Sequence, residues 1–122
     1  MTPPTILVID DESIILGVMA SSLRHAGFQV ETAASVEEAV AVTRRNVPDL
    51  IVSDVVMPEL EGPALITQLK DAGVACPVMF TSGDPSFRVV SDSLDVPGAT
   101  FLPKPFTPIE LVDAVLETLG QR

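Results

Sequence analysis

The stretch TILVIDDE, residues 5–12, decides the fold, because a short apolar run there ends abruptly in three acidic residues. Four further apolar runs follow it, at residues 28–32, 50–53, 78–81 and 100–102. Successive runs start 23, 22, 28 and 22 residues apart, which is the spacing of repeated strand–helix units. Each run is continuous rather than alternating, as expected for parallel strands that are covered on both faces. The pattern therefore predicts a five-stranded parallel sheet.

The segments between these runs have helical periodicity or carry helix-capping signals. Helices are predicted over residues 14–23, from Ser35, over 63–72, over 87–96, and from Thr107 to Gly120. Glu38 and Glu110 each lie three residues after the expected N-cap, which is the spacing of a capping box. The fourth segment is interrupted by polar residues, and we expect it to be the least stable helix. Five strand–helix units with right-handed crossovers predict a doubly wound, three-layer α/β sandwich with five helices.

Length and composition indicate one domain and exclude several classes of function. The 122 residues are one domain's worth of sequence, and 47% of them are hydrophobic, so residues 1–122 should form one core. A formal charge of −10 excludes a direct nucleic-acid ligand unless the few cations cluster. Cys76 is the single cysteine, so an intramolecular disulfide is impossible. Because neither a signal peptide nor a long apolar stretch is seen, we expect a cytoplasmic protein without membrane contact.

Polar residues collect where the predicted strands end. Asp10 and Asp11 follow the first strand, Asp54 follows the third, Ser82 lies at the end of the fourth, and Lys104 follows the fifth. Ligands of an open parallel sheet bind beyond the carboxyl ends of the strands, so these side chains should share one crevice. Taken one at a time, each could be a helix cap, a turn residue or a solvated side chain. Such features would rarely fall at the same end of consecutive strands by coincidence, which favours a site.

The residue types at these positions favour magnesium-dependent phosphoryl chemistry. Three carboxylates that lie close together need a cation to remain ionised. A set of oxygen ligands without His or thiol favours Mg²⁺, which keeps coordination positions for water and phosphate oxygens. Lys104 adds a second positive charge and, together with a hydroxyl, suits the oxygens of a phosphoryl group. An ionised Asp in such a site can act as a nucleophile and form an acyl phosphate.

Four motifs of the chain resemble those of response-regulator receiver domains. They are ILVIDDE at residues 6–12, DVVMPELEG at 54–62, PVMFTSG at 77–83 and FLPKPF at 101–106, and the similarity extends over essentially the whole chain. The resemblance implies a flavodoxin-like sheet with strand order 2-1-3-4-5. It also implies a single receiver domain over residues 1–122, without an effector domain in that range. Whether the domain stands alone or belongs to a longer chain stays open.

The resemblance implies a role for each residue of the predicted site. Asp54 would be the phosphoacceptor. Mg²⁺ would contact Asp11, Asp54 and the backbone carbonyl of Val56 directly, and Asp10 mainly through water. Lys104 would pair with Asp54 or with its phosphoryl group.

The resemblance further implies that Ser82 and Phe101 form a switch. Thr81 and Ser82 both carry hydroxyls, but the family pattern has the hydroxyl 22 positions before the lysine and before a small residue, which fits Ser82. Only one of two adjacent strand residues can face the phosphoryl group. Phe101 occupies the aromatic switch position, where Tyr is more frequent in the family. The Lys104–Pro105 peptide bond would be cis.

The implied function is a phosphorylation-dependent switch in two-component signal transduction. A phosphohistidine on a sensor histidine kinase or a histidine phosphotransfer protein would transfer its phosphoryl group to Asp54, with Mg²⁺ as cofactor. The face formed by the fourth helix, the fifth strand and the last helix would then change shape toward a downstream protein or a second copy in a homodimer. The protein would catalyse only its own phosphorylation and dephosphorylation.

Two other classes of function stay open. A pseudo-receiver that is not phosphorylated would act as a protein–protein interaction module, although the complete set of acidic, hydroxyl and lysine residues argues against it. A small phosphatase with its own aspartyl phosphate would need a second acid beside the nucleophile, and Val56 occupies that position. Incubation with Mg²⁺ and a small phosphodonor separates the three classes.

Overall fold

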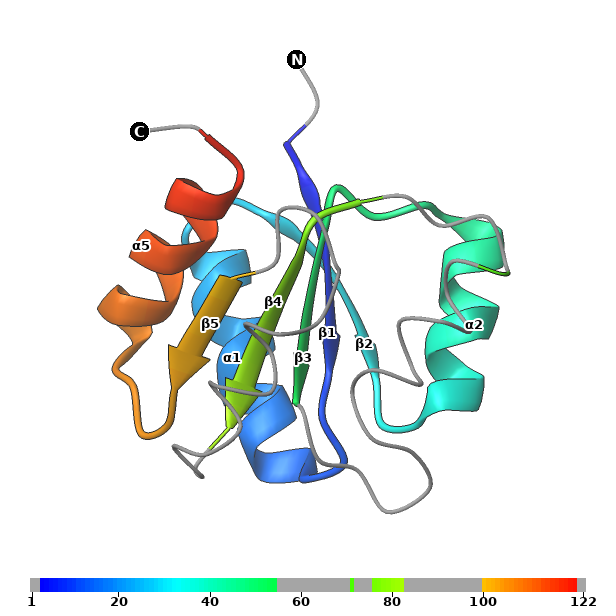
Figure 1. The fold of residues 1–122 in the computed structure, drawn as a ribbon, viewed down its shortest axis with the longest axis horizontal. Helices are drawn as coiled ribbons and strands as arrows, with labels where there is room; N and C mark the ends of the chain where they lie inside the picture. The colour runs from blue at the N-terminus through cyan, green and yellow to red at the C-terminus, as the bar shows by residue number, and fades with distance from the viewer. Residues whose placement is uncertain (1–2, 55–70, 72–75, 83–99, 121–122) are drawn as a thin grey trace.

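The computed structural model of the chain describes residues 3–54, 71, 76–82 and 100–120. In chain order, its elements are β1 (Thr5–Ile9), α1 (Ser13–His25), β2 (Gln29–Ala33), α2 (Val36–Arg45), β3 (Leu50–Asp54), β4 (Val78–Ser82), β5 (Thr100–Pro103) and α5 (Pro108–Thr118) (Figure 1). The described part therefore contains five strands and three helices. Of the helix predicted over residues 63–72, only Asp71 is described, and it is helical. The helix predicted over residues 87–96 lies outside the described residues.

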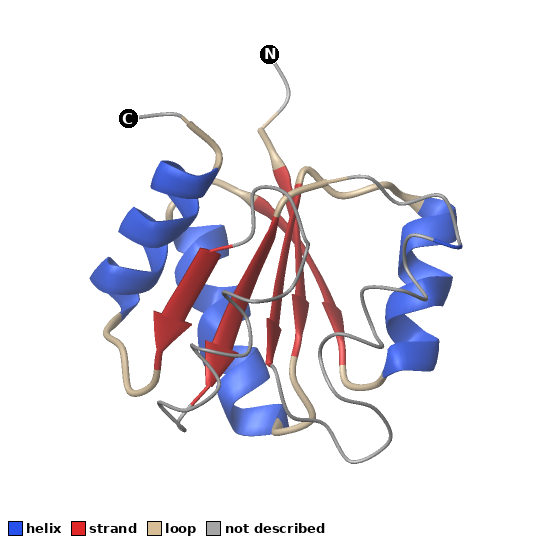
Figure 2. Cartoon of the chain, in the orientation of Figure 1, coloured by secondary structure: helices blue, strands red, loops and turns tan. Residues whose placement is uncertain are grey.

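The strands form one parallel sheet in the order β2-β1-β3-β4-β5, which confirms the order implied by the resemblance. All strand arrows point the same way, so the carboxyl ends of the strands lie at one edge (Figure 1). The central strands β1, β3 and β4 are buried along their whole length, whereas the edge strands β2 and β5 are partly exposed. Helix α1 packs beside α5, and α2 lies at the opposite side of the sheet from α5 (Figure 2).

A buried apolar cluster lies between the sheet and helices α1 and α5. Its buried members are Ile6, Val8, Met19, Leu23, Phe28, Leu50, Val52, Met79, Leu111 and Val115. Successive strand residues point to opposite faces, so residues two positions apart share a face. The face that carries Val52 and Met79 therefore continues into Asp54 and Thr81, which are partners in the β3–β4 register. This face is apolar in its middle and polar at its carboxyl-end edge.

Four of the five strands differ from the predicted ones by one residue at one or both ends. β2 is shifted by one position, and β3, β4 and β5 each extend one residue further, to Asp54, Ser82 and Pro103. Backbone pairing continues there because it does not depend on side-chain polarity, and Asp54 still pairs with Thr81. The sheet itself, rather than a loop, therefore fixes the backbone of these polar residues.

Two of the described helices begin with the predicted caps. The Ser35 hydroxyl accepts a hydrogen bond from the backbone N–H of Glu38 at 3.1 Å. Thr107 and Glu110 form a complete capping box with hydrogen bonds of 3.0 and 3.1 Å, and Pro108 lies in the first turn. These contacts satisfy backbone N–H groups that have no partner within the helix.

Helix α1 begins differently, because no side chain caps it. Its N-cap residue is Glu12, so neither Asp10 nor Asp11 is the N-cap of α1. The alternative that these two residues serve only as helix caps is therefore not supported. Gly27 follows α1 and Gly120 follows α5, with positive φ angles of 102° and 71°, a conformation that other residues rarely adopt. None of the described helices has the length and apolar character needed to span a membrane.

Candidate functional site

An acidic cluster lies at the carboxyl-end edge, where β1 and β3 end side by side. One carboxylate oxygen from each of Asp10, Asp11 and Asp54 lies within 4.8 Å of the others. Asp10 and Asp54 are buried, with 0% and 8% of their surface exposed, whereas Asp11 is exposed. The Asp10 backbone N–H donates to the Ala33 carbonyl at 3.1 Å, which extends the β1–β2 pairing to the site. The fold therefore brings together the three acidic residues selected from the sequence.

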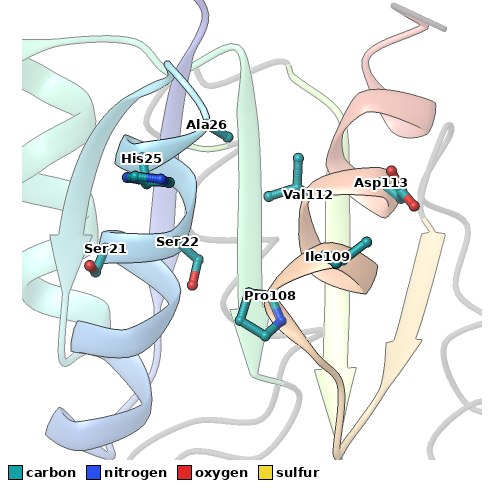
Figure 3. Close-up of a pocket in the computed structure, with 8 residues that line it drawn as sticks. All are labelled: Ser21, Ser22, His25, Ala26, Pro108, Ile109, Val112 and Asp113. Atoms are coloured by element: carbon teal, nitrogen blue, oxygen red, sulfur yellow. The ribbon is translucent and has the colours of Figure 1, made fainter.

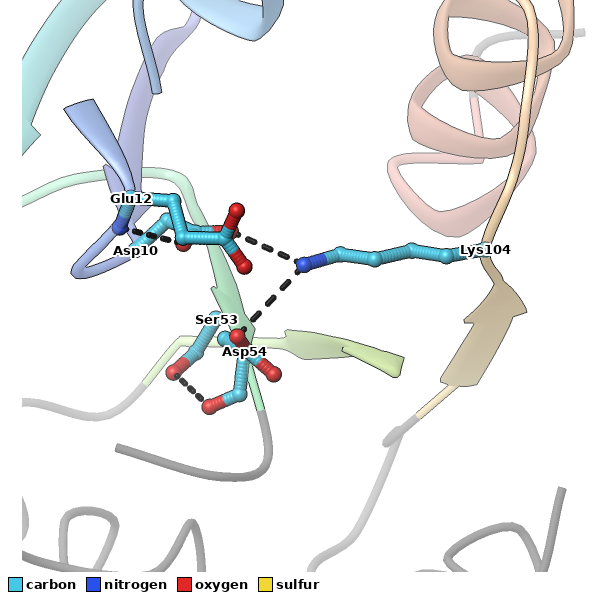
Figure 4. Close-up of polar contacts among 5 residues, drawn as sticks. All are labelled: Asp10, Glu12, Ser53, Asp54 and Lys104. Atoms are coloured by element: carbon cyan, nitrogen blue, oxygen red, sulfur yellow. Dashed lines mark hydrogen bonds and ion pairs between the residues drawn. The ribbon is translucent and has the colours of Figure 1, made fainter. Parts of the chain in front are cut away.

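The Lys104 side chain reaches into this cluster from the end of β5 (Figure 4). Its Nζ donates to Asp10 Oδ2 at 3.1 Å and to Asp54 Oδ2 at 3.4 Å. Its backbone N–H donates to the Ser82 carbonyl at 2.8 Å, which fixes the base of the side chain against β4. The family resemblance implies the contact with Asp54, and the structure adds a shorter contact with Asp10.

Burial and neighbouring charges act in opposite directions on the Lys104 ammonium. Burial by itself lowers the pKa of Lys104, because desolvation disfavours the charged form. The hydrogen bond and charge of Asp10, together with those of Asp54, outweigh burial, and the pKa of Lys104 is raised above its ordinary value. The ammonium therefore stays positive at neutral pH and can neutralise an anionic group at this edge.

The donor set of the cluster suits a hard divalent cation. Three carboxylates and one ammonium have a formal charge of −2 when all are ionised, which is the charge that a divalent cation balances. Both Asp10 oxygens already accept hydrogen bonds, Oδ1 from the Glu12 backbone N–H at 2.9 Å and Oδ2 from Lys104 (Figure 4). Asp54 likewise accepts from Lys104 through Oδ2, whereas Asp11 is exposed. Oxygen ligands of this kind fit Mg²⁺.

Two hydroxyl side chains lie at the end of β4. Ser82, the predicted switch hydroxyl, is buried and is the last residue of the strand. Thr81 is the register partner of Asp54 and is 0% exposed. Within the described part of the chain, Thr81 Oγ1 is the buried side-chain polar atom that makes no hydrogen bond. The family pattern favours Ser82 over Thr81 as the switch hydroxyl, whereas the register of β4 on β3 places Thr81 beside Asp54.

The remaining predicted site residues are Phe101 and Val56. Phe101 is half-buried in β5, where its register partner is Phe80. It lines a cavity of about 170 Å³ between β5 and α5 that also touches Ala114. The Lys104–Pro105 peptide bond is cis, as the resemblance implied. Val56 lies outside the described residues, and the roles of both residues stay predictions.

Two other chemically notable side chains, His25 and Cys76, lie apart from the acidic cluster. His25 is the exposed last residue of α1, and it borders a pocket of about 440 Å³ between α1 and α5 (Figure 3). That pocket is lined by Ser21, Ser22, His25, Ala26, Pro108, Ile109, Val112 and Asp113. Burial, and then the charge of Asp49, raise the pKa of Cys76 to about 11. The thiol is therefore protonated at neutral pH and is a poor nucleophile.

Comparison with known proteins gives one consistent family. Residues 6–116 match the family model described as the response regulator receiver domain. The chain is 36% identical over 122 residues to the transcriptional regulatory protein PrrA of Mycobacterium tuberculosis, covering 100% of this chain and 52% of that protein. It is 36% identical over 107 residues to the alkaline phosphatase synthesis transcriptional regulatory protein PhoP of Bacillus subtilis, covering 87% and 44%. The chain spans about half the length of these curated relatives.

Solved structures agree with the sequence comparison. The receiver domain of the hybrid histidine kinase CckA superposes with a TM-score of 0.79 at 36% identity, over 94% of this chain and 98% of that chain. The chemotaxis protein CheY4 of Vibrio cholerae superposes with a TM-score of 0.83 at 26% identity, over 96% and 99%. Sequence and fold therefore lead to the same family.

Proposed function

The chain belongs to the response regulator receiver domain family, and from this premise we propose that Asp54 accepts a phosphoryl group in a reaction that depends on Mg²⁺. The family acts in two-component signal transduction, so the donor is a phosphohistidine on a sensor histidine kinase or a histidine phosphotransfer protein. The observation that carries the proposal is the Lys104 ammonium, which lies 3.1 Å from Asp10 Oδ2 and 3.4 Å from Asp54 Oδ2.

The proposed transfer is an in-line displacement at phosphorus. An Asp54 carboxylate oxygen attacks the phosphorus, the P–N bond to the donor histidine breaks, and the imidazole leaves with the electron pair. The Lys104 ammonium neutralises negative charge on the phosphoryl oxygens during this step. Asp11, Asp54 and the Val56 carbonyl would hold Mg²⁺ directly and Asp10 would hold it through water, and the bound ion would supply further positive charge for the same oxygens.

Phosphorylation then biases the conformation of the domain. Ser82 donates a charge-assisted hydrogen bond to the new phosphoryl group, and Phe101 turns inward as the end of β4 moves. The surface around β5 and α5 changes as a result, and a downstream protein or a second copy of the domain reads it. Phosphorylation can shift this equilibrium only by its different affinity for the two states.

The chemistry of the rest of the chain favours a protein target in the cytoplasm. A formal charge of −10 opposes direct contact between this domain and a nucleic-acid backbone. The single cysteine suits a reducing compartment.

Incubation with Mg²⁺ and acetyl phosphate tests the proposal. The protein should gain a stoichiometric phosphate that is stable in acid and released by hydroxylamine, as expected for an acyl phosphate. Asp54→Asn should gain none, whereas Asp71→Asn, at an exposed aspartate outside the cluster, should react like the unmodified protein. A pseudo-receiver would gain no phosphate and a phosphatase would turn over many equivalents, and either result would overturn the proposal.

A further inference from the structure

We propose that the Thr81 hydroxyl donates a hydrogen bond to Asp54 while the phosphoryl group leaves, and so shortens the lifetime of the acyl phosphate. This inference rests on the phosphorylation of Asp54 proposed above. It gives Thr81 a role in dephosphorylation, separate from the role of Ser82 in responding to the phosphorylated state.

The Thr81 hydroxyl is buried and makes no hydrogen bond within the described part of the chain. Thr81 is 0% exposed, and its Oγ1 atom has no hydrogen-bond partner among the described residues. Buried polar groups nearly always have a partner, because an unpaired hydroxyl loses its water without gaining a replacement. Valine would fill the same space in a strand without this penalty. A hydroxyl at this position is explained if its partner appears in another state of the site.

The sheet brings this hydroxyl next to the acidic cluster. Thr81 and Asp54 are register partners on adjacent strands, and their side chains share a face of the sheet. Adjacent strands lie about 4.8 Å apart, so a change of the Thr81 rotamer can bring Oγ1 within hydrogen-bond distance of the Asp54 carboxyl group. The preceding residues on this face, Val52 and Met79, lie in the apolar cluster. Within the described strands β3 and β4, the polar residues on this face are therefore Asp54 and Thr81 at the strand ends.

In the described state, Asp54 shares the Lys104 ammonium with Asp10. The Lys104 ammonium already donates to Asp54 Oδ2 at 3.4 Å and to Asp10 Oδ2 at 3.1 Å. A phosphoryl group on Asp54 brings additional negative charge and attracts the ammonium away from the carboxyl oxygen. The carbonyl oxygen of the acyl phosphate then loses its contact with the ammonium, and the neighbouring Thr81 hydroxyl can donate a hydrogen bond to it.

The new hydrogen bond strengthens as the phosphoryl group leaves. Water attacks the phosphorus, the bond between phosphorus and the Asp54 oxygen breaks, its electron pair remains on the carboxylate, and the proton of the water passes to phosphate or solvent. A carboxylate accepts a hydrogen bond more strongly than a neutral carbonyl does. Thr81 therefore stabilises the transition state more than the acyl phosphate. Loss of the hydroxyl should slow dephosphorylation about tenfold, which corresponds to about 1.4 kcal/mol.

The lifetime of phosphorylated Asp54 in three variants tests this inference. Thr81→Val keeps the shape and loses the hydroxyl, whereas Thr81→Ser keeps the hydroxyl. Thr43→Val is the matched control, because it removes another buried threonine hydroxyl, which donates to the Val40 carbonyl at 2.8 Å in α2. Each protein is phosphorylated with acetyl phosphate, freed of the donor, and followed for loss of acyl phosphate at saturating Mg²⁺.

We expect Thr81→Val to lose phosphate about tenfold more slowly, and the other two variants to stay within about twofold of the unmodified protein. An unchanged or faster loss in folded Thr81→Val would overturn the inference. Thermal unfolding shows whether that variant is folded, and it should melt no lower than the unmodified protein.

A second measurement does not depend on any variant. In a crystal structure of the beryllofluoride adduct of Asp54, Thr81 Oγ1 should lie within about 3.2 Å of an Asp54 carboxyl oxygen. A larger separation would overturn the inference. Failure of the unmodified protein to take up phosphate or beryllofluoride would instead contradict the proposed function, so the two failures can be told apart.

Discussion

Replacement of Lys104 by methionine tests whether one ammonium holds the acidic cluster together. Methionine keeps an unbranched apolar side chain but removes the charge that bridges Asp10 and Asp54. The Asp10 side chain is 0% exposed, so water cannot solvate its carboxylate in place of the ammonium unless the site rearranges. The variant therefore leaves a buried carboxylate beside another carboxylate without an internal cation.

The distances set the magnitude of the expected effect. At an effective dielectric constant of about 20, unit charges 3.1 and 3.4 Å apart attract by about 5 kcal/mol each. Desolvation cancels part of this attraction, and removal of one partner of a buried pair costs about 3–5 kcal/mol. Lys104 is 17% exposed, and Asp10 can take up a proton or a cation, so we expect a loss of about 3 kcal/mol. In a domain of this size, that loss lowers the melting temperature by about 10 °C.

Urea unfolding in EDTA, followed by circular dichroism, measures this loss. Mg²⁺ should restore part of it, because the ion replaces the missing positive charge. The double variant Asp10→Asn/Lys104→Met should be more stable than Lys104→Met, since an amide needs no counter-charge. Arg45→Met, which removes a cation from the exposed end of α2, should cost less than about 1 kcal/mol. A Lys104→Met protein within about 0.5 kcal/mol of the unmodified one would refute this reasoning.

The ion pairs of Lys104 also predict how the stability of the protein changes at high pH. Because the folded-state pKa of Lys104 is raised above its ordinary value of 10.5, its stabilisation is fully present below pH 10.5. The stabilisation is lost as the pH rises through the higher folded-state pKa. The unmodified protein should therefore lose stability above about pH 10.5, and this part of the loss should be missing in Lys104→Met.

Three further predictions concern separate parts of the molecule. Asp11→Asn should weaken Mg²⁺ binding at least about tenfold by calorimetry without lowering the melting temperature in EDTA, since it removes one of three mutually repelling charges; unchanged binding would exclude direct ligation. Ile14 is 81% exposed in the first turn of α1, beside the acidic edge, so Ile14→Ser should slow phosphotransfer from a histidine kinase but not from acetyl phosphate. Val47, which is 62% exposed before β3, is the control, and Val47→Ser should change neither rate. Equal effects of the two variants would contradict the expectation that the kinase contacts the start of α1. Cys76, whose pKa is raised by burial and by the charge of Asp49 to about 11, should react slowly with a disulfide reagent at pH 8 and faster as the pH approaches 11; the rate of a free thiol at pH 8 would contradict its burial.

The architecture could be predicted because its signals are local in the sequence. Continuous apolar runs identified the strands, and the Ser35 and Thr107 hydroxyls begin helices where the spacing to a glutamate predicted them. The boundaries could not be predicted to the residue, because strand pairing depends on the neighbouring strand and continues through polar positions such as Asp54 and Ser82. Hydropathy marks where a strand is buried, and backbone pairing decides where it ends.

The contacts within the site could not be predicted to the same degree. The sequence shows that Asp10, Asp54 and Lys104 end neighbouring strands, but it does not show that the ammonium lies closer to Asp10 than to Asp54. That preference depends on how the lysine crosses the edge of the sheet. The pairing of Thr81 with Asp54 likewise depends on the stagger of β4 against β3.

The short connection between Lys104 and α5 has a practical consequence for measurement. Lys104 is three residues from Thr107, the N-cap of α5, so a short connector joins the ammonium that contacts Asp54 to the start of an outer helix. Ile109, in the first turn of that helix, is 74% exposed. A fluorophore attached there would stand in solvent, and the short connector would let it respond to a movement of Lys104. We expect a reporter at this position, introduced by Ile109→Cys, to follow phosphorylation of Asp54 while the acidic cluster and Lys104 stay unchanged.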